Sequence, residues 1–278
     1  MSLIPVQDLL KILEDSSPIL LDASWYLPAA KRNAEAEYRA AHLPGAQFFN
    51  IDAICDSQSI YPHMLPSEEV FTDAVSALGV RSDDHVVIYD SSGVFSAPRA
   101  WWMFRVFGHS QVSVLNGGIN AWRQAGGTVH AGIADGVPRG DFRALFQSEY
   151  YADIERVNAA CGDSSAMIVD ARSPGRFSGI DPEPREGLSS GCMPGAINLP
   201  FNDCIDKVSG QLMTPEQLEQ VFSEVGVPAD GDIITTCGSG ITACVLALAL
   251  DQTGRSARVY DGSWVEWATK SSKVPSHG

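Results

Sequence analysis

The chain has 278 residues, of which 45% are hydrophobic and 19% charged, and its formal net charge is −15. This is the composition of a globular protein that is long enough for two domains. The acidic excess argues against a nucleic-acid-binding surface, and no apolar run approaches the ~20 residues that a membrane span needs.

The N-terminal residues and the spacing of the cysteines narrow the class of protein further. Residues Met1–Pro5 lack the basic and apolar parts of a signal peptide, so we expect a cytoplasmic location. The six cysteines are scattered without a Cys-x-x-Cys pair, so neither a zinc cluster nor a disulfide framework is expected. An anionic substrate would have to be captured by a local group of arginines, because the chain as a whole is acidic.

Short apolar segments alternate with helical stretches along the chain. They predict six strands: Ile19–Asp22, Val86–Tyr89, Val112–Leu115, Met167–Asp170, Ile233–Thr236 and Arg258–Tyr260. A stretch with Gly132, Gly136, Pro138 and Gly140 predicts a linker, and a helix is expected from Tyr150 to Ala160. Such alternation is typical of an α/β fold with mostly parallel sheets flanked by helices.

The same short motifs occur twice in the same order, which indicates a duplicated domain. The matching segments, at offsets of 145 to 150 residues, are Leu20–Ala23 with Ile168–Ala171, His42–Ala46 with Cys192–Ala196, Val86–Asp90 with Ile233–Cys237, and Gly117 and Trp122 with Gly262 and Trp267. The period is too long for a solenoid. We therefore predict domain 1 over residues 1–131, a linker over 132–148 and domain 2 over 149–278.

Cys237 is the strongest candidate for a nucleophile. It follows the predicted strand Ile233–Thr236 and precedes a Gly-Ser-Gly loop and a long apolar segment that predicts a helix. The N–H groups of such a turn and the helix N-terminus favour an anion, and the glycines allow close backbone approach. The alternative is a buried core cysteine, a common environment for free thiols. The matching residue in domain 1 is Asp90, so domain 1 is predicted to be non-catalytic.

These features resemble the tandem rhodanese-type sulfurtransferases over nearly the whole chain. The Cys-Gly-Ser-Gly-Ile-Thr-Ala segment that starts at Cys237 resembles the 3-mercaptopyruvate sulfurtransferase subgroup in particular. The resemblance implies two rhodanese-like domains, an inactive first one and a catalytic second one. It also implies a persulfide intermediate on Cys237.

The resemblance also implies the other site residues. His63 and Asp52 would face Ser239 as a proton relay, with a structural hydrogen-bonded cluster as the alternative. The implied substrate-binding residues are Arg176, Arg185, Gly238, Gly240, Ile241 and Thr242. Arginine offers a planar fork of donors that suits a carboxylate and a keto oxygen. Thr242 would either cap the following helix or donate to the sulfur, and Arg172 is expected to form a structural salt bridge.

The loop composition separates the possible substrates. Thiosulfate-specific relatives typically carry basic residues directly after the cysteine, whereas Gly238 and Ser239 are neutral, which disfavours that dianion. Phosphatases of this fold need an arginine where this chain has Ala243.

We therefore expect sulfur transfer from 3-mercaptopyruvate to a thiol, cyanide or a thioredoxin-like protein, with release of pyruvate. Because sulfur itself carries the chemistry, no metal or organic cofactor is expected. The alternatives are a thiosulfate sulfurtransferase and a non-enzymatic persulfide carrier or regulatory module.

Overall fold

The computed structural model describes residues 1–133 and 137–270. Residues 134–136 of the predicted linker and 271–278 of predicted domain 2 lie outside the described residues. The chain divides into two compact units. Unit 1 holds Met1–Gln58, Leu65–Gln147 and Asp206–Leu212, and unit 2 holds Ser59–Met64, Ser148–Ile205 and Met213–Gly278.

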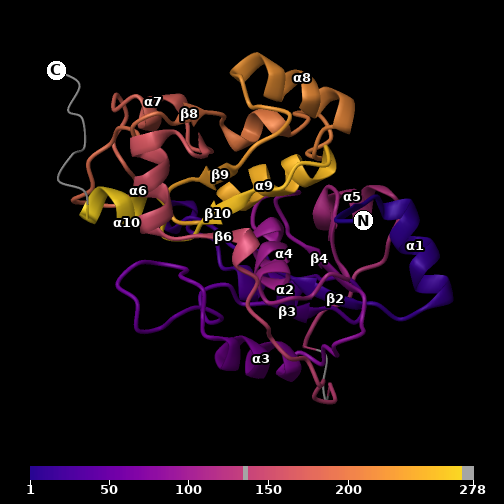
Figure 1. The fold of residues 1–278 in the computed structure, drawn as a ribbon. Coiled ribbons are helices and arrows are strands. Elements are labelled where there is room, and N and C mark those ends of the chain that lie inside the picture. Colours follow the sequence, from indigo (N-terminus) through magenta and orange to yellow (C-terminus); the bar gives the residue numbers. More distant parts are fainter. Residues whose placement is uncertain (134–136, 271–278) are drawn as a thin grey trace. The chain divides into compact units, whose positions relative to one another are not determined.

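Unit 1 is built on a parallel sheet of five strands in the order β1-β5-β4-β2-β3 (Figure 1). Its strands are β1 (Leu3–Ile4), β2 (Ile19–Asp22), β3 (Gln47–Phe48), β4 (Val86–Tyr89) and β5 (Val112–Leu115). The central strands are buried on both faces, which explains their continuous apolar sequences. Asp22 pairs with Tyr89 at the carboxyl ends of β2 and β4, so polar residues that follow these strands meet at one sheet edge.

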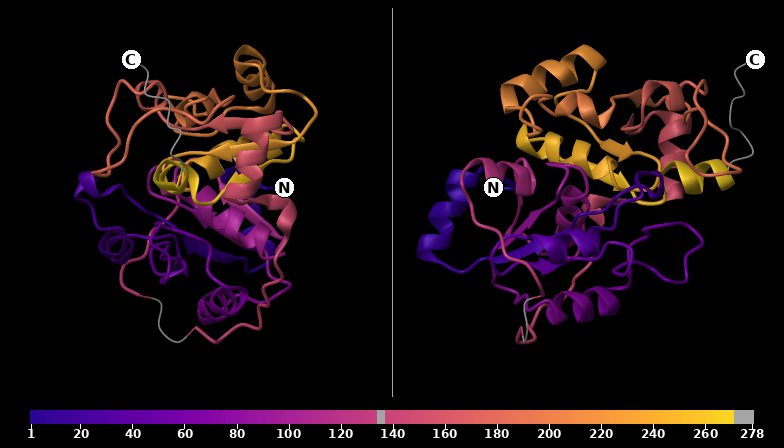
Figure 2. Two further views of the ribbon diagram at one scale, coloured as in Figure 1. Left: turned by 60° about the vertical axis from the view of Figure 1, so that its left-hand side comes forward. Right: turned by 180° about the vertical axis from the view of Figure 1, so that it is seen from behind.

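Helices cover both faces of the unit 1 sheet. They are α1 (Val6–Asp15), α2 (Ala34–Ala40), α3 (Glu68–Ala77), α4 (Ala97–Val106) and α5 (Gly118–Gln124). The helices α1 and α5 lie beside each other (Figures 1 and 2), and Leu9 and Trp122 share one core with Val87. A second core joins α3 and α4 through Phe71 and Phe104, whose ring centroids are 5.4 Å apart.

Unit 2 repeats this plan with the strand order β6-β10-β9-β7-β8, again parallel throughout. Its elements are β6 (Tyr151–Ala152), α6 (Ile154–Asp163), β7 (Met167–Asp170), α7 (Pro174–Phe177), β8 (Ile197–Asn198), α8 (Pro215–Val225), β9 (Ile233–Thr236), α9 (Ala243–Gln252), β10 (Arg258–Tyr260) and α10 (Ser263–Lys270). Short 3-10 turns occur at Pro28–Ala30, Ser148–Tyr150 and Phe201–Cys204. Every residue from Ala243 to Leu250 is buried, because α9 packs against β9, β10 and α8.

The predicted fold class and all six predicted strands are confirmed. The four strands that the sequence did not predict are two residues long and lie at sheet edges, and two residues are too few to carry a periodic pattern. The helix predicted to begin at Tyr150 is wrong at its start. Tyr151 and Ala152 pair with β10, and the helix begins only after Asp153, whose side chain caps the N–H of Arg156.

The described part of the predicted linker is packed rather than loose. Phe142 is buried, and its ring lies 5.7 Å from that of Phe71. The N–H of Gly140 donates to the carbonyl of Ser76, and an added Cβ at Gly140 would clash with the backbone of Val80. This segment is therefore fixed against unit 1. Among the described residues, no helix combines the length and the hydropathy that a membrane crossing requires.

Candidate active site

Cys237 lies at the carboxyl end of β9, in the tight loop that leads into α9 (Figure 1). The residue is 2% exposed. The loop reverses direction at Gly240, whose φ of +78° lies in the left-handed region that glycine adopts without strain. The strand, turn and helix predicted around this cysteine are thus present.

The start of α10 fixes the backbone on either side of the thiol. The N–H groups of Trp264 and Val265 donate to the carbonyls of Cys237 and Gly238, each at 3.0 Å. Ser263 Oγ accepts from the N–H of Cys237 at 3.2 Å and lies 3.9 Å from its Sγ. The same hydroxyl donates to the carbonyl of Tyr260 at 2.8 Å, so its contact with Sγ is the weaker one. The sequence reading missed Ser263, although it directly follows Gly262 of the repeated Gly–Trp pair.

Unit 1 shows what the corresponding loop can bind. There the Oδ2 atom of Asp90 accepts from the N–H groups of Phe95, Ser96 and Ala97 at 2.8, 2.9 and 2.9 Å. An aspartate Oδ is two bonds from Cβ, whereas the cysteine Sγ is one bond from it. The loop of unit 1 therefore presents converging donors to an anionic atom one bond farther out than Sγ.

Arg176 lies directly against the cysteine loop. A Cβ added at Gly238 would come within 2.8 Å of Arg176 Nη2, so the guanidinium occupies the space beside the residue that follows Cys237. Arg176 is in the last turn of α7, and its side chain is 23% exposed. The structure thus brings together Arg176 and Gly238, which are 62 positions apart in the chain.

A chain of four alternating charges holds Arg176 in place. Glu183 accepts from Nε of Arg176 at 3.2 Å and from its Nη2 at 2.5 Å. Glu183 also accepts from Nη1 of Arg172 at 2.7 Å, and Arg172 in turn contacts Asp170 at 2.6 Å. The side chains of Asp170 and Arg172 are fully buried, and that of Glu183 is 2% exposed. The salt bridge expected for Arg172 is present, whereas Glu183 was not predicted from the sequence.

The buried end of this chain is further fixed. Arg172 donates to the carbonyl of Gly191 at 2.7 Å, and its guanidinium lies 4.2 Å from the ring centroid of Trp264, a cation–π contact. Burial raises the pKa of the Asp170 carboxyl, and the Arg172 guanidinium acts against that rise. Glu183 accepts from Nε and from one N–H of Nη2, so both N–H groups of Nη1 and the second N–H of Nη2 remain for a ligand.

Ser239 and His63 contact each other within unit 2. Nδ1 of His63 lies 3.2 Å from the backbone carbonyl oxygen of Ser239. Because a carbonyl only accepts, Nδ1 carries the proton and Nε2 is the basic nitrogen of the neutral ring. Both residues are buried, and His63 has a positive φ of 63°. Asp52 belongs to unit 1, where it accepts from Trp25 Nε1 at 2.9 and 3.1 Å.

The remaining predicted residues lie in the same two loops. Ile241 is buried, and Thr242 is the N-cap residue of α9 without a side-chain capping bond, so the capping alternative is wrong. Arg185 is half-buried, two residues beyond Glu183. Cys244 is buried and its thiol donates to the carbonyl of Gly240 at 3.2 Å. Among the described residues, no group of three or more His, Cys, Asp or Glu side chains could hold a metal ion.

Comparison with known proteins agrees with the duplicated architecture. The rhodanese-like domain matches twice, over residues 5–125 and 152–270. The chain belongs to the rhodanese family. It is 43% identical to the 3-mercaptopyruvate sulfurtransferase of Homo sapiens, over 89% of this chain and 84% of that protein.

Two other rhodanese relatives are informative. The thiosulfate sulfurtransferase of Gallus gallus is also 43% identical, over 89% of this chain and 85% of that protein. The crystal structure of SseA, a 3-mercaptopyruvate sulfotransferase from Escherichia coli, matches with a TM-score of 0.86 at 37% identity. That match covers 95% of this chain and 99% of SseA.

Proposed function

We propose that this rhodanese-family protein is a sulfurtransferase that moves sulfur from 3-mercaptopyruvate to a thiophilic acceptor and releases pyruvate. The observation that carries the proposal is the placement of the Arg176 guanidinium against Gly238, beside the Cys237 thiol. A cation against the residue that follows the nucleophile suits a donor that joins its sulfur to a carboxylate through a short carbon chain. The 3-mercaptopyruvate sulfurtransferases among the relatives support the same donor.

The donor is held by arginines. Arg176 keeps the N–H groups of Nη1 and one N–H of Nη2 for the ligand, because Glu183 accepts only from Nε and from the other N–H of Nη2. Arg185 follows in the same loop and supplies the second cation, one arginine for the carboxylate and one for the keto oxygen. The loop residues Gly238, Gly240, Ile241 and Thr242 then form the wall next to the transferred sulfur.

The first chemical step forms the persulfide. The Cys237 thiolate attacks the sulfur of 3-mercaptopyruvate, the carbon–sulfur bond breaks, and its electron pair leaves on pyruvate as an enolate. The enolate takes up one proton to give pyruvate. His63 and Ser239 are the candidates for this proton delivery, because an imidazole can hold and release a proton. We propose that Asp52 assists them.

The persulfide is stabilised by the loop. Its outer sulfur is two bonds from Cβ, as is the Asp90 Oδ2 that accepts three loop N–H groups in unit 1. The equivalent amides of unit 2 would therefore reach the outer sulfur rather than Sγ. In the second step an acceptor thiolate attacks this outer sulfur, the S–S bond breaks, and the Cys237 thiolate is regenerated.

A thioredoxin-like protein, a small thiol or cyanide serves as the acceptor, and the proposed location is the cytoplasm. The second candidate donor is thiosulfate, which the name of the Gallus gallus relative supports. The neutral pair Gly238 and Ser239 argues against it, because a dianion gains from cations directly after the cysteine.

The test measures two reactions on one preparation: pyruvate release from 3-mercaptopyruvate and thiocyanate formation from thiosulfate with cyanide. We expect the first to have the higher kcat/KM. Mass spectrometry after donor treatment should show one added sulfur on the peptide that contains Cys237. Cys237→Ser should lose both the adduct and turnover, whereas Cys244→Ser, which also removes a buried thiol, should keep them.

The outcomes separate the alternatives. A higher kcat/KM with thiosulfate would replace the proposed donor and keep the nucleophile. Sulfur on Cys244 with none on Cys237 would overturn the nucleophile. A stable persulfide on Cys237 without release of pyruvate would indicate a carrier rather than an enzyme.

A further inference from the structure

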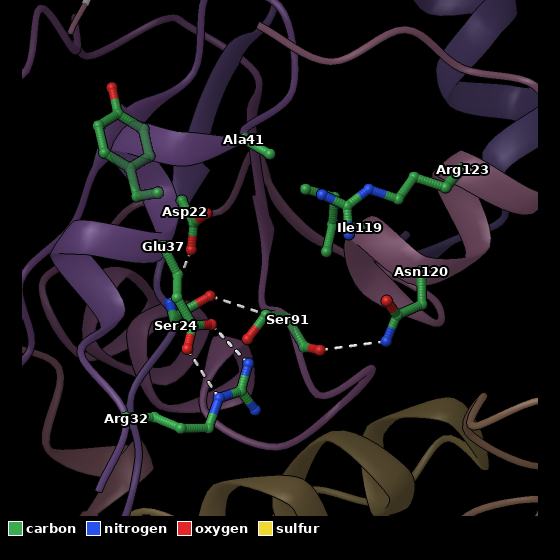
Figure 3. Close-up of a pocket in the computed structure, with 10 residues that line it drawn as sticks. Asp22, Ser24, Arg32, Glu37, Ala41, Ser91, Ile119, Asn120 and Arg123 are labelled. Atoms are coloured by element: carbon green, nitrogen blue, oxygen red, sulfur yellow. Dashed lines mark hydrogen bonds and ion pairs between the residues drawn. The ribbon is translucent and has the colours of Figure 1, made fainter. Parts of the chain in front are cut away.

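Unit 1 has a polar cavity of about 110 Å³ at the carboxyl edge of its sheet (Figure 3). Asp22 and Ser24 follow along the chain from β2, and Ser91 follows β4. The lining residues are Asp22, Ser24, Arg32, Glu37, Tyr38, Ala41, Ser91, Ile119, Asn120 and Arg123. The proposed sulfur transfer does not use any of them.

The duplication explains why there is space here. In unit 2 the corresponding edge is filled, because Arg172 pairs with the buried Asp170 and stacks on Trp264. Asp22 matches Asp170 in the repeated strand motif, and the residue two positions later is Ser24 instead of Arg172.

The stacking partner is exchanged as well. By the offset that relates Gly117 to Gly262 and Trp122 to Trp267, Ile119 stands where Trp264 stands. Both replacements are smaller, and both line the cavity. Unit 1 thus keeps the buried carboxyl group but lacks the guanidinium that neutralises its counterpart.

Asp22 has no cationic partner in the part of the chain that the structure describes. It is 3% exposed, and its Oδ1 accepts from the N–H of Ser24 at 2.9 Å. Burial raises the pKa of its carboxyl from 3.8 to about 6. Arg32 does not neutralise it, because Nε and Nη2 of Arg32 both donate to Glu37. Near neutral pH a buried carboxylate is therefore left without a counter-ion.

Arg123 supplies the opposite charge at the same cavity. It lies in the last turn of α5, and within residues 1–133 and 137–270 its guanidinium has neither a hydrogen bond nor an ion pair. Figure 3 shows the Arg123 side chain directed from α5 toward the side of the cavity on which Asp22 lies. The two groups do not pair with each other. The cavity is therefore lined by one buried carboxyl group and one exposed arginine, neither of which has an oppositely charged partner among the described residues.

We propose that this cavity binds a small α-amino acid as its zwitterion. The ligand ammonium group takes the place of the missing guanidinium beside Asp22, and the ligand carboxylate meets the fork of Arg123. The hydroxyl of Ser91 and the side chain of Asn120, whose Nδ2 donates to the Ser91 carbonyl, border the space between them. A cavity of about 110 Å³ limits the ligand to a short side chain.

The two charges distinguish this ligand from simpler ones. An anion alone would leave the buried Asp22 without a counter-ion and would be repelled by it. A cation alone would leave Arg123 unused. A zwitterion satisfies both groups at once, and its ammonium charge stabilises the ionised form of Asp22.

The experiment uses three matched probes and isothermal titration calorimetry on the full chain. L-alanine carries both charges, propionate lacks the ammonium group, and ethylammonium lacks the carboxylate. We expect L-alanine to bind the wild type about tenfold or more tightly than either fragment, because each fragment forfeits one charged contact. Asp22→Asn and Arg123→Gln should each weaken L-alanine binding by about tenfold to a hundredfold.

Three further variants control the result. Arg39→Gln removes an exposed arginine that pairs with Glu35 and does not line the cavity, so it should bind L-alanine as the wild type does. Cys237→Ser should also bind it normally, which separates this site from the sulfur-transfer site. Ser24→Arg, which restores the arrangement of unit 2, should abolish binding.

Two results would overturn the proposal. One is the absence of saturable L-alanine binding to the folded wild type. The other is binding of propionate as tight as that of L-alanine, with no effect of Asp22→Asn, since this would describe an anion site.

Discussion

Because Arg176 lies against Gly238, the addition of a single methyl group at position 238 tests whether the position of the arginine matters for activity. In Gly238→Ala the new Cβ would lie 2.8 Å from Arg176 Nη2 and 3.9 Å from Cζ. The first distance is too short for two non-bonded atoms, so one of them must move. The φ of Gly238 is not in the left-handed region, so alanine fits the backbone there. The strain therefore falls on the arginine side chain.

The expected effects on stability and activity differ. The free energy of unfolding should change by no more than about 1 kcal/mol, since Gly→Ala at a compatible position is mildly stabilising and a flexible side chain can yield. Moving the guanidinium away from the loop removes one charged hydrogen bond to the donor, which is worth ~1.5–3 kcal/mol. The value of kcat/KM for 3-mercaptopyruvate should thus fall about tenfold to a hundredfold.

The assay is steady-state pyruvate release, with urea unfolding on the same samples. Gly162→Ala is the matched control, because Gly162 lies in α6 and an added Cβ there meets no atom within 4 Å. The double variant Gly238→Ala/Arg176→Ala should be no less active than Arg176→Ala alone, since both changes act on one contact. A folded Gly238→Ala protein with wild-type kcat/KM, or losses that multiply in the double variant, would refute the reasoning.

Three further predictions concern stability, each measured by urea unfolding. Glu183→Gln removes the carboxylate that pairs with the buried Arg172 and with Arg176, and it should lower the free energy of unfolding by about 3–5 kcal/mol. Glu219→Gln, the control at an exposed pair with Arg255, should lower it by less than about 1 kcal/mol. Equal losses in the two variants would contradict the structural role of Glu183. The pKa of Asp22 is raised to about 6 in the folded protein, so the folded state binds the proton more tightly than the unfolded state does. The contribution of protonated Asp22 to the free energy of unfolding is therefore lost as pH rises from about 4 to above 6. Without ligand, Asp22→Asn should therefore gain about 3 kcal/mol on the wild type across that range, at ~1.36 kcal/mol per pKa unit; a difference that is independent of pH would contradict it. Asp90→Ala removes the acceptor of four loop N–H groups and should lower the free energy of unfolding by at least about 3 kcal/mol. Asp90→Asn keeps one carboxamide oxygen and should lower it by less. If both variants were as stable as the wild type, the loop would not need its anion.

The sequence by itself determined the features that depend on neighbouring residues or on the repeat. Continuous apolar runs predicted the six longer strands, because a strand buried on both faces must be apolar throughout. The repeat offset predicted two copies of one α/β plan and identified Asp90 as the residue of domain 1 that corresponds to Cys237. The position of Cys237 after a strand and before a glycine loop was sufficient to single it out, since strand, turn and helix are local signals.

Only the tertiary structure decided which side chains meet. Glu183 joins Arg172 to Arg176, and Ser263 reaches Cys237, because separate loops return to the same sheet edge. His63 was predicted to face Ser239, and the structure shows that its Nδ1 contacts the backbone oxygen of that residue. The direction of a side chain depends on the packing around it, and no spacing in the sequence encodes that packing.

For the cavity of unit 1, too, the sequence predicts one part and only the folded structure shows the other. The exchange of Arg172 for Ser24 and of Trp264 for Ile119 can be read by aligning the two copies of the repeat. Whether smaller residues leave a space or the surroundings collapse into it is a question of close packing. The folded chain keeps that space open, with the carboxyl group of Asp22 buried at its edge.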